Sequence, residues 1–292
     1  MKLFKNYSKK KIFIVVMILV VMLAGLELYC SNECLTVSRY EVTDARIEGK
    51  VRMAVLADLH NHEFGKNNQR LIQRVKDENP DIILCVGDFV NREEENTEVA
   101  ERVVTELCKI APVYVSLGNH EVGQEELFGT DLKRTFERCG AKVLEYAYED
   151  VDISGQKLRI GGLYGYCVPA KYLASQEADA QECAFFEEFM NTENYTVFLC
   201  HIPCMWTVGE ALEEWKIDLV VSGHSHGGQI RIPFVGGVYA PDEGWFPGRT
   251  CGVYQSEDET RTMVLTRGLG STGKIPRINN IPEITIVDLK EK

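Results

Sequence analysis

The heptapeptide GHSHGGQ, residues 223–229, combines residue types that support two different chemistries. It fits the G-x-S-x-G pattern of a nucleophile elbow, in which Ser225 would attack the substrate of a serine hydrolase. It also places His224 and His226 on either side of one small residue, directly after an apolar run, as expected of two metal ligands at a strand end. The rest of the sequence distinguishes between these interpretations.

A nucleophile elbow requires a helix immediately after its serine, and the triad histidine must follow the serine in the chain. Residues 229–234 instead alternate, contain Pro233 and lead into two glycines, which predicts a strand and a turn. His226 is the last histidine of the sequence. Both requirements fail, and we interpret Ser225 as a small residue that lets the two neighbouring rings converge.

The remaining histidines favour the metal interpretation. Five of the six in the chain lie just past predicted buried strands, and carboxylate and amide residues occupy equivalent positions. Imidazole and carboxylate ligands suit Zn, Fe and Mn, and a two-metal site needs a bridging carboxylate to hold the ions about 3.5–4 Å apart. The candidate ligands are Asp58, His60, Asp88, Asn119, His201, His224 and His226. Seven ligands exceed the needs of one ion; the sixth histidine, His62, is expected in a loop near the site.

The elements that position these residues follow a repeating pattern. Apolar runs at 51–57, 81–86 and 112–117 predict strands, and they are separated by helical patterns at 67–79 and from 92 to 110. This order predicts βαβ units with a parallel sheet, whose ligands gather at the carboxyl ends of the strands. Downstream we expect hairpins over 144–165, a loop or short helical insertion over 164–180, a helix over 182–190, and strands at 195–200, 217–222, 263–266 and 283–289.

Composition restricts the class of protein. The 292 residues, 45% of them hydrophobic, are enough for a buried core, and a globular enzyme is the default. A net charge of −12 without a basic stripe argues against nucleic-acid binding. The ten cysteines form no CxxC pair, which disfavours a thiol or disulfide enzyme. Cys85 and Cys200 lie in apolar runs and are expected to be buried, unpaired thiols, whereas Cys30 and Cys34 either pair or belong to a linker.

The N-terminus predicts membrane targeting. A basic tail, residues 1–11, precedes an apolar segment over 12–29 that only Glu27 interrupts. We interpret the segment as a transmembrane signal anchor rather than a cleaved signal peptide, because no A-x-A-like cleavage site follows. Lysines on the cytoplasmic side would place the linker over 30–50 and everything after it outside the cell membrane. Secretion after signal cleavage is the alternative.

The ordered motifs, taken together, resemble a known family. Asp58-x-His60, Gly87-Asp88, Gly118-Asn119-His120-Glu121, an isolated His201 and Gly223-His224-x-His226 resemble the signature of the calcineurin-like metallophosphoesterase superfamily. The motifs span residues 51–228, and the tail, with RGLG at 267–270 and PRINNIPE at 276–283, resembles the bacterial branch that carries an anchor or export signal. The resemblance implies a four-layer α/β/β/α sandwich over residues 51–292, preceded here by the transmembrane helix.

The resemblance also implies a role for each residue. Asp58, His60 and His226 would hold one divalent metal ion, Asn119, His201 and His224 the second, and Asp88 would bridge them. His120 would protonate the leaving oxygen or stabilise the phosphate, with Glu121 orienting it. Arg92 either binds the substrate phosphate or opens a solvated helix, and the helix is favoured.

The implied activity is hydrolysis of a phosphoester, whether phosphodiester, pyrophosphate or monoester. Two cations, Mn, Zn or Fe, would neutralise phosphoryl oxygens and lower the pKa of a shared water, so that hydroxide attacks phosphorus. The anchor favours a lipid-linked or cell-envelope substrate reached at the membrane. The alternative is a non-catalytic, metal-stabilised, membrane-anchored binding protein. Oligomeric state leaves no trace in the sequence.

Overall fold

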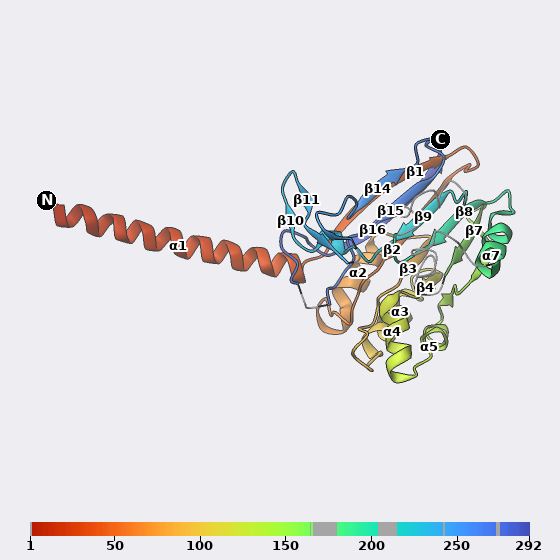
Figure 1. Ribbon diagram of the computed structural model, residues 1–292, viewed down its shortest axis with the longest axis horizontal. Helices are drawn as coiled ribbons and strands as arrows, with labels where there is room; N and C mark the ends of the chain where they lie inside the picture. Colours follow the sequence, from red (N-terminus) through yellow and green to blue (C-terminus); the bar gives the residue numbers. More distant parts are fainter. Residues whose placement is uncertain (1, 164, 166–179, 204–214, 242, 273–274) are drawn as a thin grey trace.

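Two six-stranded sheets stacked face to face form the body of the protein, and one long helix projects from it (Figure 1). The computed structural model describes residues 2–163, 165, 180–203, 215–241, 243–272 and 275–292. Most of the insertion expected over 164–180 lies outside the described residues.

The first sheet carries the first three candidate ligand motifs. Its strands in spatial order are β1 (Thr36–Asp44), β16 (Glu283–Glu291), β2 (Lys50–Leu56), β3 (Ile82–Val86), β4 (Val113–Ser116) and β5 (Lys142–Val143). Neighbours are parallel except β16 and β2. The sheet begins upstream of residue 51, because β1 lies within the range expected to be a linker.

The second sheet carries the remaining motifs. Its strands in spatial order are β14 (Gly252–Gln255), β15 (Thr262–Leu265), β9 (Leu219–Ser222), β8 (Tyr195–Leu199), β7 (Gln156–Gly162) and β6 (Ala147–Ile153). The four central strands are parallel to one another, and β6 with β7 forms the expected antiparallel hairpin.

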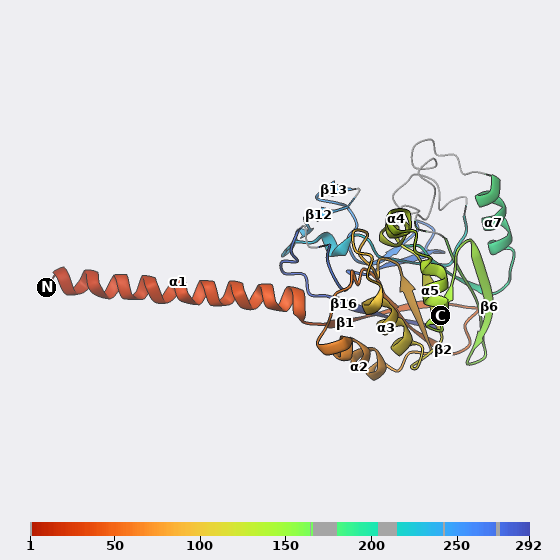
Figure 2. The same cartoon turned by 90° about the horizontal axis from the view of Figure 1, so that it is seen from below.

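Three apolar layers hold the sandwich together. One lies between the sheets, where side chains such as Val55 and Leu84 meet Val197 and Val221. A second joins the first sheet to α2 (Gln69–Asp77), α3 (Glu98–Leu107) and α5 (Leu132–Arg138). The third packs α7 (Ala180–Met190) on the second sheet (Figure 2). The expected four-layer α/β/β/α order is therefore confirmed.

Two local expectations are wrong. The helix expected from Arg92 begins only at Glu98, because Asn91 and Glu94 bind each other in a turn, and the Asn91 side chain also donates to the His60 carbonyl oxygen. Cys200 is disulfide-bonded and follows the end of β8, whereas Cys85, inside β3, is the expected buried free thiol. Cys30 and Cys34 are free.

Short elements complete the fold, and of these only β10 lies within a predicted strand, at 229–234. They are η1 (Lys66–Asn68), α4 (Asn119–Phe128), η2 (His226–Gly228), β10 (Arg231–Ile232), β11 (Gly236–Gly237), β12 (Tyr239–Ala240) and β13 (Gly244–Trp245). β10 pairs with β11 and β12 with β13, as two small hairpins. Ser225 is followed by the three-residue η2 and the short strand β10, and not by the longer helix that a nucleophile elbow needs.

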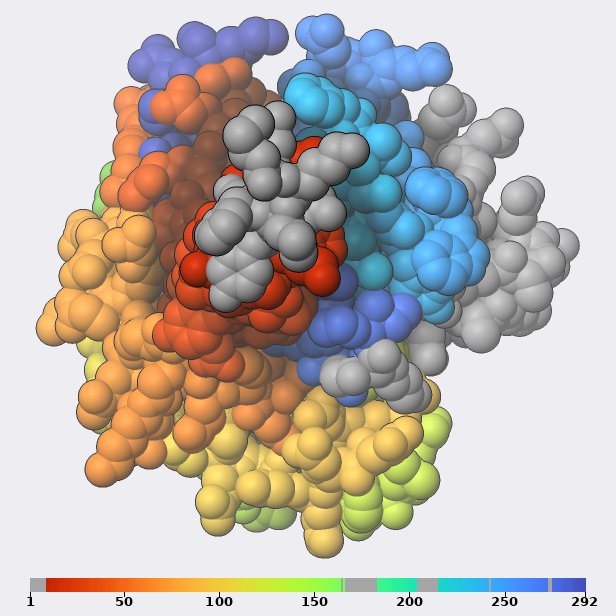
Figure 3. All heavy atoms as spheres, turned by 90° about the vertical axis from the view of Figure 1, so that its left-hand side faces the viewer, coloured from red at the N-terminus to blue at the C-terminus, as the bar shows by residue number. Residues whose placement is uncertain are grey.

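The N-terminal helix α1 (Lys2–Glu33) stands clear of the sandwich except at its end. Residues 9–33 are long and apolar enough to cross a membrane, and the side chains of residues 9–26 are exposed. Such a helix serves as a membrane span or as a signal sequence. Figure 3 looks along the helix toward the face of the sandwich from which it emerges.

Candidate metal centre

The predicted ligands converge where strands of both sheets end. Asp58 follows β2, Asp88 follows β3 and Asn119 follows β4, while His201 and His224 follow β8 and β9. Among the described residues, side chains that could hold an ion form three overlapping groups. These are Asp58 with His60 and His226, Asp88 with His201 and His224, and His60 with Asp88 and His120.

Asp88 occupies the central position. Its Oδ2 lies 3.0 Å from His201 Nε2 and 3.8 Å from His60 Nε2, so one carboxylate faces both sets of histidines. Asp58 Oδ1 lies 3.7 Å from His226 Nε2 and 3.9 Å from His201 Nε2. A carboxylate between two groups of imidazoles is what a bridged pair of cations requires.

Several candidate ligand atoms lack any hydrogen-bond partner among the described residues although they are buried. They are both ring nitrogens of His60, His226 Nδ1 and Asn119 Oδ1. Buried polar atoms without partners are costly, and metal coordination would satisfy them. His201 Nδ1 lies 2.7 Å from the Val86 carbonyl oxygen, which favours the proton on Nδ1 and leaves Nε2 free to coordinate. The residues therefore fit divalent metal ions.

The buried ionisable groups of the site have shifted pKa values. Burial raises the pKa of Asp58 to about 6 and lowers the pKa of His60 to about 3. Burial also lowers the pKa of His226 well below its usual range, which keeps that ring neutral. For His201 burial acts in the same direction, but the Asp88 carboxylate overrides it and raises the pKa to about 10. Neutral imidazoles and ionised carboxylates are the forms that bind metals.

The loops that carry the ligands depart from ordinary backbone geometry. Asp58, His60, Asp88, His224 and His226 all have positive φ, between 45° and 68°. For residues other than glycine this conformation is uncommon and costs about 1–3 kcal/mol each, so it persists only where the surroundings enforce it.

Gly118 is required by this packing. A Cβ atom there would lie 2.3 Å from Asp88 Oδ1. Gly227 and Gly228 follow His226 directly. They leave room for the Asn280 side chain and for the backbone of Gly237.

Glu121 lies in the site but does not contact the His120 ring as the sequence suggested. Its buried carboxylate accepts hydrogen bonds from the N–H groups of Gly118, Asp88, Phe89 and Val90. It therefore ties the loop after β3 to the start of α4 and fixes the position of Asp88.

The His120 ring is oriented by Arg92. The Arg92 backbone N–H donates to His120 Nδ1 at 3.0 Å, and the guanidinium donates to the Asn119 carbonyl oxygen at 3.2 Å. Because Nδ1 accepts this bond, the neutral ring carries its proton on Nε2. His62, with 28% of its side chain exposed, is outside the three groups and faces Glu33 at the end of α1.

Two further residues support the site and are not found from the sequence. Asn280 is buried and its side-chain amide donates to the carbonyl oxygens of His226 (2.7 Å) and Gln229 (3.1 Å). Arg277 is also buried and donates to the carbonyl oxygens of Gly270 and Arg267, in the loop beside Asp58. Both lie in the RINN stretch 277–280, whose only signal in the sequence is its resemblance to the bacterial branch.

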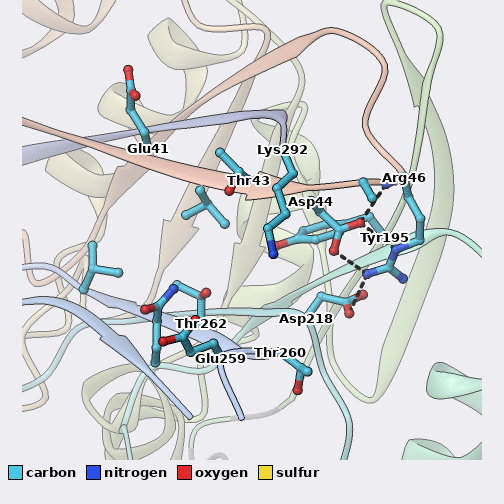
Figure 4. A pocket seen from close by; sticks show the side chains of 14 residues that line it. Glu41, Thr43, Asp44, Arg46, Tyr195, Asp218, Glu259, Thr260, Thr262 and Lys292 are labelled. Atoms are coloured by element: carbon cyan, nitrogen blue, oxygen red, sulfur yellow. Dashed lines mark hydrogen bonds and ion pairs between the residues drawn. The ribbon is translucent and has the colours of Figure 1, made fainter. Parts of the chain in front are cut away.

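A second cavity, of about 440 Å³, opens at the opposite edge of the sandwich, near the amino ends of β8 and β15. Figure 4 shows Arg46 there between Asp44 and Asp218, at 2.8 and 2.7 Å. Arg46 is paired with both carboxylates, and no metal-binding group of described residues lies in this cavity.

Comparison with known proteins agrees with the geometry. The family model of the calcineurin-like phosphoesterases matches residues 51–228, and the chain belongs to this family. It is 25% identical to the uncharacterized metallophosphoesterase YkoQ of Bacillus subtilis, over 81% of this chain and 82% of that protein. It is 29% identical to the phosphodiesterase YaeI of Escherichia coli, over 82% of both chains.

Solved structures with a similar arrangement include a dimetal phosphatase from Danio rerio. That match has a TM-score of 0.45 and 10% identity, over 76% of this chain and 88% of the other. A 5′-nucleotidase precursor from Thermus thermophilus gives a TM-score of 0.49 and 17% identity, over 77% and 50%. This chain is a metal-dependent phosphoesterase with a centre suited to two ions.

Proposed function

We propose that the protein hydrolyses a phosphoester at a membrane surface with two divalent metal ions. Asp58, His60 and His226 would hold one ion, and Asn119, His201 and His224 the other, with Asp88 between them. The observation that carries this assignment is the position of Asp88 between two groups of buried ligand atoms. Mn, Zn and Fe all suit this donor set.

The two ions would supply Lewis-acid stabilisation of the phosphoryl oxygens and activation of a water. The protein's own part is to hold the ligands and to offer a proton to the reacting group. His120, with Nδ1 occupied by the Arg92 N–H, presents Nε2–H as a hydrogen-bond donor. This supports a role in stabilising negative charge on the phosphate or leaving oxygen, worth about 10²–10³-fold in rate by analogy with other oxyanion donors.

Arg92 and Glu121 would act as positioning residues. Arg92 holds the His120 ring through its backbone and covers α4 with its side chain, with the guanidinium on the Asn119 carbonyl. Glu121 holds the backbone of Asp88. We do not assign the Arg92 side chain a contact with the substrate phosphate, because one guanidinium N–H donates to the Asn119 carbonyl oxygen and Nε is buried.

The helix supports one substrate class. An apolar α1 that ends beside the metal centre supports a membrane lipid or cell-envelope phosphoester as substrate. A relative over 82% of this chain, from Danio rerio, is itself named a transmembrane protein with a metallophosphoesterase domain.

The test uses the full chain in lipid nanodiscs, stripped with a chelator and reloaded with Mn, Zn or Fe. A chromogenic phosphodiester and its monoester counterpart report turnover, and bound metal is counted by mass spectrometry. We expect two ions per chain and metal-dependent turnover, with both lost in Asp88→Asn.

His62→Gln is the matched control, since this histidine is close in sequence to two ligands but outside the three groups. It should retain both ions and full turnover. Two bound ions without turnover on any phosphoester, lipid phosphodiesters included, would favour the non-catalytic binding protein. No bound metal would refute the proposal.

A further inference from the structure

Two small hairpins beside the metal centre expose large apolar side chains in two segments, residues 233–235 in the β10–β11 turn and residues 245–246 at the end of β13. These two segments are called the tips. The β10–β11 turn presents Phe234, fully exposed, and Val235, 61% exposed. The β12–β13 hairpin presents Trp245 and Phe246, 68% and 65% exposed. A cluster of largely exposed aromatic side chains on two neighbouring hairpins indicates an interaction surface rather than ordinary scatter of apolar residues.

The backbone holds these rings outward. Phe234 and Phe246 have positive φ, 68° and 57°, a conformation that is uncommon for a bulky residue. Phe246 N–H donates to the Val238 carbonyl oxygen at 2.7 Å, and the Val235 N–H donates to the Ile232 carbonyl oxygen. The fold therefore maintains an unfavourable backbone at both tips while leaving the two phenylalanine rings without a partner in the described part of the chain.

The hairpins are joined to the metal centre. The Val238 N–H donates to the Gly228 carbonyl oxygen, and Gly228 packs against Gly237 so closely that a Cβ would not fit. Gly228 belongs to η2, which begins at the ligand His226. The hairpins are therefore joined to the turn that carries His226.

The same region receives the end of α1. Ser31 Oγ accepts a hydrogen bond from the Asn280 N–H at 3.0 Å, the Asn279 N–H donates to Glu27, and the Asn32 side chain donates to the Arg277 carbonyl oxygen. Figures 1 and 3 show the hairpin segment on the face from which the helix emerges. Because α1 leaves the domain as an apolar helix of membrane-spanning length, the bilayer surface would lie against this face.

We propose that the tips at residues 233–235 and 245–246 are a second membrane contact that inserts into the interfacial region of the bilayer beside α1. Trp and Phe prefer this depth, where apolar rings leave water without entering the hydrocarbon centre. With the helix, the tips would hold the metal centre in a fixed orientation at the headgroups. The inference rests on the membrane anchoring proposed above and adds the surface that orients the site.

Apolar insertion, rather than attraction to anionic lipid, would drive this contact. Glu243, next to the second tip, is exposed and acidic. We therefore expect the contact to form on purely zwitterionic phosphatidylcholine.

The experiment measures the depth of Trp245 in the full chain. The protein is reconstituted in phosphatidylcholine vesicles with or without acyl chains brominated near the headgroup. The chain has three tryptophans, and the emission difference between wild type and Trp245→Phe isolates Trp245. We expect brominated lipid to remove most of this difference, and equal emission differences in the two lipids would overturn the proposal.

A second variant tests the tips themselves. Phe234→Asp combined with Phe246→Asp should restore Trp245 emission in brominated lipid, whereas the matched control Leu127→Asp, at an exposed apolar position of α4, should not. Unchanged quenching in the tip variant, or equal loss in the control, would contradict the assignment. An unquenched Trp245 together with a dimer that the tip variant dissociates would assign the tips to a second copy instead.

Turnover of a soluble chromogenic diester is measured on the same samples. The tip variant should retain it, because neither phenylalanine is in the metal centre. If wild-type protein turns over the diester but brominated lipid does not quench Trp245, the membrane contact alone is refuted. If Trp245 is quenched but wild-type protein shows no turnover, the proposed activity alone is refuted.

Discussion

At the scale of single residues, the candidate metal ligands differ in their hydrogen bonds from the residues that position them. His60 and His226 have buried nitrogens without hydrogen-bond partners among the described residues, whereas the His120 Nδ1 atom is occupied by the Arg92 N–H. The hydrogen-bond pattern thus assigns different roles to histidines that look alike in the sequence.

His120→Ala tests that division. We expect metal content to stay at two ions while kcat for a phosphodiester falls about 10²–10³-fold, with a smaller change in KM, because the lost donor acts mainly on developing charge. Kinetics and metal counting on the same preparation check this. Loss of one ion would show that His120 is a ligand, as its proximity to His60 and Asp88 allows.

Asn280→Ala tests the support behind His226. The substitution leaves the carbonyl oxygens of His226 and Gln229 without their buried donor, which costs about 1–3 kcal/mol of stability per unpaired group. We expect weaker binding of one metal ion, as disturbing a supporting residue costs about 10–100-fold in affinity. Calorimetric metal titration measures it. The control is Asn279→Ala, whose side chain binds Arg231 at an exposed position; an equal effect there would contradict this account.

At the scale of elements, the first sheet owes part of its cohesion to a charge cluster across β2 and β16. Asp288 accepts hydrogen bonds from Arg52 at 2.8 and 3.1 Å, and Lys50 lies 2.8 Å from the same carboxylate. Burial opposes ionisation of Asp288, but the bonds from Arg52 and Lys50 prevail and lower its pKa.

This shift predicts a pH dependence of stability. A carboxyl whose pKa is lower in the folded than in the unfolded state stabilises the protein above its unfolded pKa, about 3.9, and loses that contribution as pH falls through the folded value. Asp288→Asn should therefore cost about 1–3 kcal/mol between pH 5 and pH 7 and progressively less below about pH 4. Denaturant unfolding in detergent across this range would show it, and a cost independent of pH down to about pH 2 would contradict it.

At the scale of the whole molecule, the N-terminal helix and the candidate metal centre are parts of one connected structure. Residues 27–33 of α1 bind the 277–280 stretch, which binds the loop of His226. We expect the helix to determine where the enzyme works rather than whether it works.

A chain beginning at residue 27 tests this. It retains Glu27 and Ser31 and should hydrolyse a soluble phosphodiester at the wild-type rate, but lose most of its turnover on a phosphodiester lipid in vesicles, because local concentration at the bilayer is lost. Parallel assays on the two substrates measure the effect. Equal turnover on lipid by both chains would argue against a membrane substrate.

Metal binding should also stabilise the folded protein as a whole. The folded centre brings buried carboxylates close to ring nitrogens that have no hydrogen bonds among the described residues. We therefore expect ions to bind the folded state far better than the unfolded chain. A free metal concentration about 100 times the Kd contributes about 2.7 kcal/mol per site. Thermal unfolding with and without Mn should show a clear rise in Tm in wild type and a smaller one in Asp88→Asn; identical rises would contradict the assignment of Asp88.

The buried strands that precede the candidate ligands, and the residues that gather at their ends, follow from the sequence alone. Runs such as 81–86 and 195–200 are apolar on both faces, which is typical of buried strands, and side chains that follow parallel strands meet at one sheet edge regardless of detail. Because that physical rule is local, the sequence is enough to predict Asp58, Asp88 and His201 as neighbouring ligands.

What surrounds those ligands depends on tertiary contacts. Asn280 lies 54 residues from His226 and 249 from Ser31, yet binds both, and no periodicity encodes such contacts. Arg92 belongs to a turn rather than a helix because that turn is bound to the loop after β2: the Asn91 side chain donates to the His60 carbonyl oxygen, and the Asn61 side chain donates to Glu94. The exposure of Phe234 and Trp245 depends equally on which surfaces the fold leaves uncovered, since burial is a property of the packed molecule and not of the residue.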